Sequence, residues 1–371
     1  MAGEGSQVID ILGAADLISK GQRRPESIIS GMLKTGKIPP SLLFTGPEGA
    51  GKELIALSLA ARLNCTAPAK CAVERCGSCR KTGRFEHPDF HPLYPLPSGP
   101  QEKTMPVILE SRRENFFEKG EFGNKNRSIG IEMIRRLIED LSKKPFEGAW
   151  LPVILFEAHR ATVEAQNAFL KLLEEPPSSA VLILVTEFPE RLLPTILSRC
   201  QEIRFDPLPE DTVSSFLETF YSIEKSESQR LAVLAGGNLR RGADFLDERF
   251  LRLRNDAVSV LKLAIEGKTR QLPLEAEEMA HEYTREETAV LLKEMTALLR
   301  QMLLRGDGSL SERESKLLEE EFGEKSIEAA AKREITDDIR KVNVASRGLG
   351  RNIDIELMWT QLLLDLAGKW Y

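Results

Sequence analysis

The chain has 371 residues, of which 42% are apolar and 29% charged, and its formal net charge is −6 at pH 7. This length predicts two or three domains, and the acidic balance excludes a strongly basic, self-sufficient nucleic-acid binder. The sequence shows no apolar run of membrane-spanning length and no signal-peptide pattern at its first residues. We therefore expect a cytoplasmic protein without a membrane partner.

The first forty residues predict helices in pieces, with a break at Gly21-Gln22. Residues 42–44 then read as a short buried strand, and residues 52–64 have helical periodicity. Between them, residues 46–53 read Gly-Pro-Glu-Gly-Ala-Gly-Lys-Glu, which follows the phosphate-binding pattern G-x-x-x-x-G-K-[S/T] in the required strand–loop–helix order. The alternative is a Gly/Pro surface turn without function.

This loop departs from its pattern at the last position, where Glu53 replaces the hydroxyl that would hold Mg²⁺. A carboxylate about 4 Å from a phosphate charge costs roughly 1 kcal/mol at the dielectric of water and about 4 kcal/mol near a protein surface. The loop backbone and Lys52 can still hold phosphate, so we expect a degenerate nucleotide site that disfavours Mg²⁺. Its candidate residues in the loop are Gly46, Pro47, Gly49, Gly51, Lys52 and Glu53.

Four of the five cysteines fall within fifteen residues, and Cys76 and Cys79 form a C-x₂-C knuckle. Clustered thiols in a reducing cytosol indicate zinc rather than disulfides. Cys65 and Cys71 can complete a closed Cys₄ site, which predicts structural Zn²⁺ and no zinc chemistry. The spacing of Cys71 is wide for a knuckle, and the alternative is a set of free thiols.

Beyond the cysteines, residues 97–127 are polar and of mixed charge, and they are expected to leave the core as an insertion. Ser128 is expected to cap an amphipathic helix over residues 131–141. Residues 151–156 and 180–186 are continuous apolar runs typical of buried parallel strands. Strands and helices that alternate after a phosphate-binding loop predict a doubly wound α/β domain with a parallel sheet.

After Pro207-Leu208-Pro209 the sequence shows only helical periodicity and no convincing strand. We expect an α/β domain over residues 1–207, a small helical unit over 208–248 and an all-α domain over 249–371. A helix is also expected over residues 189–198, near the end of the first of these domains.

Two further blocks make one resemblance specific. Residues 165–177 read AQNAFLKLLEEPP and residues 192–200 read LLPTILSRC. With the loop and the cysteines, they resemble subunits of the bacterial DNA polymerase III clamp loader, an AAA+ machine that opens the sliding clamp and places it on primed DNA. The resemblance covers about residues 20–245. It implies a helical lid at 208–248, an oligomerising helical collar at 249–371, and partners that include gamma/tau ATPases, a delta subunit, the clamp and primer–template DNA.

Within this family, the segments at residues 86–90 and 144–148 resemble the delta-prime type of subunit rather than the ATPase motors. The cysteine spacing C-x₅-C-x₄-C-x₂-C departs from the usual C-x₈-C-x₂-C-x₂-C. This difference leaves open whether Cys71 is a zinc ligand. The pair aligned with the motors' Asp-Glu is Phe156-Glu157. P-loop enzymes hold Mg²⁺ with the loop hydroxyl and that Asp. We therefore expect weak or no ATP hydrolysis, with ATP or ADP binding still open.

The resemblance assigns other roles residue by residue. In this family the arginine of SRC is a finger that reaches a neighbour's ATP site, which implies that role in trans for Arg199; such fingers contribute roughly 10³–10⁵ in rate. Thr186 and Arg240 resemble sensor positions, although Arg241 fits nearly as well. The predicted function is a largely non-hydrolysing clamp-loader subunit. The alternatives are an active gamma/tau-like ATPase motor and a zinc-bearing adaptor outside replication.

Overall fold

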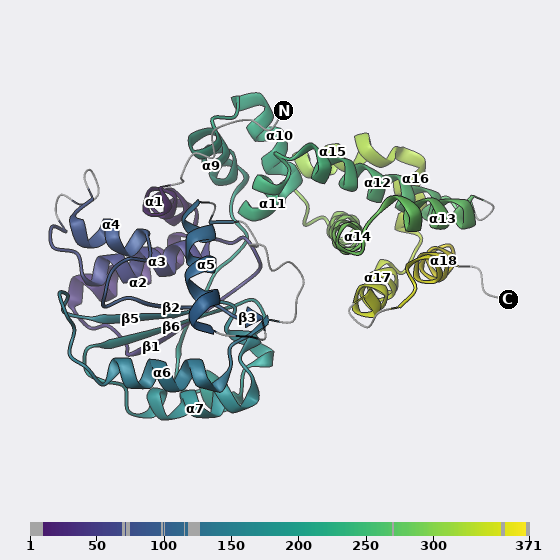
Figure 1. Ribbon diagram of the computed structural model, residues 1–371. Coiled ribbons are helices and arrows are strands. Elements are labelled where there is room, and N and C mark those ends of the chain that lie inside the picture. Colours follow the sequence, from purple (N-terminus) through teal and green to yellow (C-terminus); the bar gives the residue numbers. More distant parts are fainter. Residues whose placement is uncertain are drawn as a thin grey trace. The chain divides into compact units, whose positions relative to one another are not determined.

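The computed structural model describes residues 10–68, 71, 75–97, 99, 101–114, 116–117, 127–268, 271–349 and 353–368. The chain divides into two compact units, Met1–Ala243 and Asp244–Tyr371 (Figure 1). Among the described residues, no helix has both the length and the apolar character needed to cross a membrane. The three-part division at residues 207 and 248 stays a prediction.

A five-stranded parallel sheet forms the centre of the first unit, in the order β2-β5-β6-β1-β7 (Figure 1). The predicted strands β1, β5 and β6 are buried along their whole lengths, as expected for a sheet covered on both faces. The predicted α/β fold class is therefore confirmed. The strands are β1 (Ser41–Thr45), β2 (His91–Leu93), β5 (Leu151–Leu155), β6 (Ala180–Thr186) and β7 (Gln201–Arg204).

Helices cover both faces of this sheet: α2, α3 and α4 lie on one face, and α6 and α7 lie on the other (Figure 1). The break predicted at Gly21-Gln22 is confirmed, since α1 ends at Gly21 and α2 begins at Arg23. The helices of this part are α1 (Ile11–Gly21), α2 (Arg23–Thr35), α3 (Lys52–Leu63), α4 (Gly77–Gly83), α6 (Ile131–Leu141) and α7 (Val163–Glu174).

The predicted cap of α6 is wrong. Ser128 lies in the short strand β4 (Arg127–Ser128), which pairs antiparallel with β3 (Leu96–Pro97). The N-cap residue of α6 is Gly130, which has no side chain to accept a bond from the first helical turn. Burial of Met133 and other apolar residues on one face holds the helix instead.

Two elements near residue 200 also differ from the prediction. The expected helix over residues 189–198 is a 3₁₀ turn, Pro189–Arg191, followed by the four-residue helix α8 (Pro194–Leu197). Strand β7 was not predicted, because only Ile203 of its four residues is buried. An edge strand of this kind shows no apolar run that sequence patterns can detect.

The insertion at residues 97–127 does not simply leave the core. It contains helix α5 (Gln101–Glu114), in which Ile108 and Arg112 are buried, and Phe116 just beyond the helix is buried too. Residues 118–126 lie outside the described part of the chain. Two side chains of α5, those of Ile108 and Arg112, thus reach inward, where the sequence predicted an excursion from the core.

Two segments that carry the family resemblance bind each other. The buried carboxylate of Asp89 accepts hydrogen bonds from the backbone N–H groups of Phe146, Glu147 and Gly148, the last two at 2.9 and 2.7 Å. Burial raises the pKa of Asp89, but these three donors outweigh it and hold the pKa below its usual value. This anchor fixes the loop that leads into β5.

Every described element after residue 209 is helical, as predicted. Three helices of the first unit follow the sheet: α9 (Glu210–Tyr221), α10 (Lys225–Ala235) and α11 (Leu239–Asp244). The second unit has one apolar core centred on residues such as Trp359 and Leu292. Its helices are α12 (Glu248–Ile265), α13 (Leu272–Glu282), α14 (Arg285–Gly306), α15 (Glu312–Phe322), α16 (Glu324–Ala331), α17 (Ile335–Leu349) and α18 (Ile355–Leu366).

Candidate functional site

The phosphate-binding loop connects β1 to α3, and its glycines allow close approach of other segments. Gly49 has φ +71°, and a Cβ there would lie 1.8 Å from the Asn238 Oδ1 atom. Gly51 has φ +83°, and a Cβ there would lie 2.4 Å from Ile18 Cγ2. Any larger residue would push the loop away from α1 and from the start of α11.

Lys52 is the first residue of α3 and is buried. Its ammonium donates hydrogen bonds to the carbonyl oxygens of Gly46, at 2.8 Å, and Pro47. Burial lowers the pKa of Lys52, and the nearby carboxylates, Glu187 first among them, offset this only in part. The lysine that would hold phosphate is thus bonded to the loop's own backbone.

The two positions that would anchor Mg²⁺ carry neither the hydroxyl nor the aspartate of the usual pattern. Glu53 forms an ion pair with Arg112, with 3.9 Å between Oε2 and Nη1. Phe156 is fully buried and stacks on the Tyr94 ring, with centroids 4.1 Å apart. Since the loop hydroxyl and the Walker B aspartate are both replaced, this site lacks the donors that hold the metal in P-loop enzymes.

Glu157 follows Phe156 in a left-handed conformation, with φ +47°. Its carboxylate pairs with Arg160 at 2.6 Å and with Arg127 at 3.6 Å. Burial raises the pKa of Glu157, but the arginines, Arg127 first, outweigh it and hold the pKa below its usual value. The side chain is therefore an ionised carboxylate that is already neutralised by two cations.

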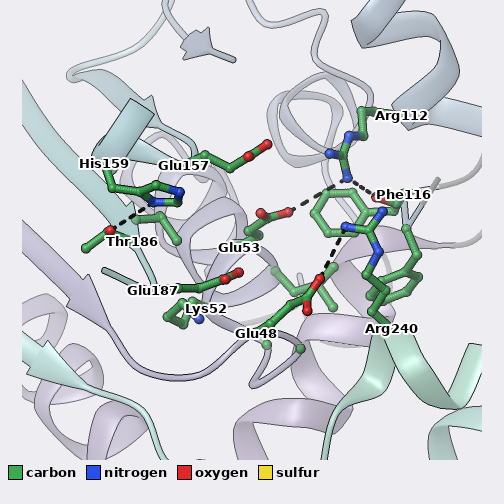
Figure 2. A pocket seen from close by; sticks show the side chains of 15 residues that line it. Glu48, Lys52, Glu53, Arg112, Phe116, Glu157, His159, Thr186, Glu187 and Arg240 are labelled. Atoms are coloured by element: carbon green, nitrogen blue, oxygen red, sulfur yellow. Dashed lines mark hydrogen bonds and ion pairs between the residues drawn. The ribbon is translucent and has the colours of Figure 1, made fainter. Parts of the chain in front are cut away.

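A small cavity of about 60 Å³ lies beside the loop (Figure 2). Its wall includes the predicted sensor residues Thr186 and Arg240, and Arg240 lies 3.9 Å from the Glu48 carboxylate. Thr186 Oγ1 lies 3.1 Å from Nδ1 of His159, and burial lowers the pKa of His159 to about 4. The imidazole is thus neutral at pH 7, and the structure places Arg240 rather than Arg241 on the cavity wall.

The wall residues that sequence reasoning missed include Arg112, Phe116, Phe117 and His159. The first three come from the insertion, far from the loop in the sequence. The available signal was the pair of adjacent phenylalanines in an otherwise polar segment. Such a pair is expected to find a buried partner somewhere in the fold.

Arg199 lies two residues beyond α8 and does not line the cavity of its own loop. Its guanidinium donates to the Glu174 carboxylate at 2.8 Å and to the Thr195 carbonyl at 3.1 Å, and its side chain is 36% exposed. A surface pair of this kind contributes at most about 1 kcal/mol. Neighbouring Cys200 is no activated nucleophile, because burial raises its pKa to about 11.

The four clustered cysteines meet in space between the end of α3 and the start of α4. Their sulfur atoms all lie within 4.8 Å of one another, and those of Cys65 and Cys76 are 3.9 Å apart. A tetrahedral Zn–S site with bonds of about 2.3 Å requires sulfurs roughly 3.8 Å apart. The geometry fits a structural zinc ion, and it includes Cys71 in spite of that residue's unusual spacing.

A protein-family model described as "DNA polymerase III, delta subunit" matches residues 21–209, just over half of the chain. The chain belongs to this family. The matched region contains the loop, the cysteine cluster and Arg199. The helices from α9 onward lie beyond it.

The individual relatives that the chain matches are also DNA polymerase III subunits. The chain is 29% identical over 213 residues to DNA polymerase III subunit delta′ of Bacillus subtilis (strain 168), covering 57% of this chain and 54% of that protein. It is 32% identical over 199 residues to subunit delta′ of Pseudomonas aeruginosa, covering 53% and 52%. It is 26% identical over 239 residues to subunit tau/gamma of Haemophilus influenzae, covering 63% and 30%. The chain spans about half the length of the delta′ relatives.

Proposed function

We propose that this chain is a delta-prime-like subunit of a clamp loader, which helps to place the sliding clamp on primed DNA. Its partners in this proposal are gamma/tau ATPases and a delta subunit in one hetero-oligomer. Clamp and DNA are then engaged through the complex. The proposal rests on the family membership and on the names of the relatives, two of which are delta′ subunits.

One observation carries the catalytic part of this proposal: both metal-anchoring positions are lost while an arginine stands exposed at another surface. Glu53 is paired with Arg112, and Phe156 is buried in the core. Without a positioned Mg²⁺, little of the charge that develops on the phosphates can be neutralised. A nucleotide held by Lys52 and the loop backbone would not be turned over, so the chain itself contributes little or no ATP hydrolysis.

Arg199 would then act in trans, on the ATP of an adjacent subunit. The planar, permanently charged guanidinium suits the oxygens of a γ-phosphate. Its present partners are an exposed carboxylate and a backbone carbonyl, which a phosphate can replace at little cost. These features support a finger, whereas the site favours neither an ATPase motor nor an adaptor outside replication.

The remaining parts have structural roles in this proposal. Zn²⁺ held by the four cysteines would staple α4 to the end of α3, because a closed Cys₄ site leaves no position for water. Residues 208–248, which include helices α9–α11, would form the lid. The all-α region over 249–371 would form the collar through which the subunits assemble.

Reconstitution tests the proposal. The purified chain, mixed with gamma/tau and delta subunits of its own organism, is expected to elute with them as a single hetero-oligomer. Clamp loading on primed DNA, followed with a labelled clamp, is expected to fall at least tenfold when this chain is left out. If the chain elutes alone and loading proceeds unchanged without it, the proposal fails and the alternative of an adaptor outside replication is favoured.

A further inference from the structure

The cavity beside the phosphate-binding loop is far too small for a nucleotide. Its volume is about 60 Å³, whereas sites for small molecules and cofactors usually measure about 300–1,000 Å³. Arg112, Phe116 and Phe117 from the insertion form part of its wall, and Figure 2 labels the first two of them. The insertion therefore takes up space beside the loop.

Arg112 is firmly built into this position. Its side chain is buried, its Nη1 donates to the Phe116 carbonyl, and its guanidinium lies 5.1 Å from the centre of the Tyr94 ring. The same nitrogen lies 3.9 Å from Glu53. A buried cation that also contacts an aromatic face is costly to displace.

The two residues that depart from the metal-binding pattern are both linked to this arginine, Glu53 directly and Phe156 through Tyr94. Glu53 supplies its carboxylate partner, and Phe156 supplies the flat ring on which Tyr94 stacks at 4.1 Å. Tyr94 in turn lies under the guanidinium. Glu53, Arg112, Tyr94 and Phe156 thus form one chain of contacts that joins both altered positions.

The same segment also contacts the lid. The Phe117 ring meets the Phe216 ring of α9 edge-on, with centroids 5.5 Å apart. Elsewhere in the lid, the backbone N–H of Leu239 in α11 donates to the Gly49 carbonyl of the loop at 3.0 Å. The loop and the lid are therefore joined by contacts of the chain itself.

From these contacts we propose that α5 and the Phe116-Phe117 turn form an internal plug, which occupies the nucleotide site and holds the lid on the loop without any ligand. The subunit then keeps one closed conformation whatever the ATP concentration. A nucleoside triphosphate binds only after Arg112 and the two phenylalanines have moved aside. The inference rests on the proposed function only for the identity of the loop as a nucleotide site.

Nucleotide binding by the isolated full-length chain tests the plug, with a fluorescent ATP analogue as the probe, with and without Mg²⁺. Wild type is expected to show no saturable binding at millimolar probe. The double variant Arg112→Ala/Phe117→Ala is expected to bind at least tenfold more tightly, and adding Lys52→Ala should abolish this. Arg113→Ala is the matched control, because the Arg113 side chain bonds the Arg84 carbonyl and lies outside the cavity wall.

Saturable binding by wild type, or a folded double variant that still does not bind, would overturn the plug. Should the double variant fail to fold, hydrogen exchange of wild type decides. Residues 46–52 and 210–221 are expected to exchange equally with and without millimolar ATP, and protection by ATP would refute the inference. Failure here leaves the clamp-loader role intact, because that role is measured by reconstitution and depends on Arg199.

Discussion

Changing Arg199 to Ala is expected to lower ATP turnover at the adjacent subunit's site by about 10³-fold or more, the scale on which arginine fingers act. The side chain is exposed, and its contacts in the structure are with Glu174, Thr195 and, at 3.5 Å, Ser198, so its loss should not disturb folding. The measurement is the steady-state ATPase of a reconstituted complex in which only that adjacent site is intact.

Two controls frame this result. Arg191→Ala removes a nearby exposed arginine, which lies over the Phe188 ring, and should leave turnover unchanged. Glu174→Gln frees Arg199 from its ion pair without removing the finger, and turnover should stay at or above that of wild type. An Arg199→Ala complex that assembles and hydrolyses ATP at the normal rate would end the assignment of a role in trans.

Loss of zinc is the second change expected to have a large effect. Structural Zn²⁺ contributes about 10–16 kcal/mol of apparent binding free energy in zinc-finger peptides at pH 7, and here the cysteines form one small buried cluster with Leu12 and Ala61. The double variant Cys76→Ser/Cys79→Ser is expected to lose its zinc and to unfold at a lower temperature. Metal analysis and thermal melting of the purified chain check this.

Cys200→Ser is the matched control, because Cys200 lies far from the cluster in sequence and is not among its sulfurs; it should retain about one equivalent of zinc. Cys71→Ser decides whether the widely spaced cysteine is a ligand, and the geometry predicts that zinc affinity falls. Full zinc content in the double variant would show that the metal lies elsewhere.

The sequence predicted the elements that one physical signal dominates. Strands β1, β5 and β6 are buried on both faces, so each contains a continuous apolar run. Strand β7 has one buried residue and gives no such run. Gly130 replaced the expected cap Ser128 because the packing of α6, rather than a side-chain bond, holds that helix.

The site was predictable as far as local motifs reach. The loop, Glu53, Phe156 and Arg199 could be named from the sequence, because each lies within a short pattern. Arg112 and Phe117 could not, since their partners Glu53 and Phe216 lie far away in the chain and contact them only in the folded protein. Cys71 is intermediate: its spacing argued against a ligand role, and the fold brings its sulfur to the cluster.

The central claim is that this chain has lost its own ATP chemistry and acts on a neighbour's. ATP turnover by the isolated chain, with Mg²⁺ and primed DNA, tests it most directly. The account predicts no turnover above that of the Lys52→Ala variant. Robust Mg²⁺-dependent hydrolysis that disappears in Lys52→Ala would contradict it and would identify the chain as an active motor.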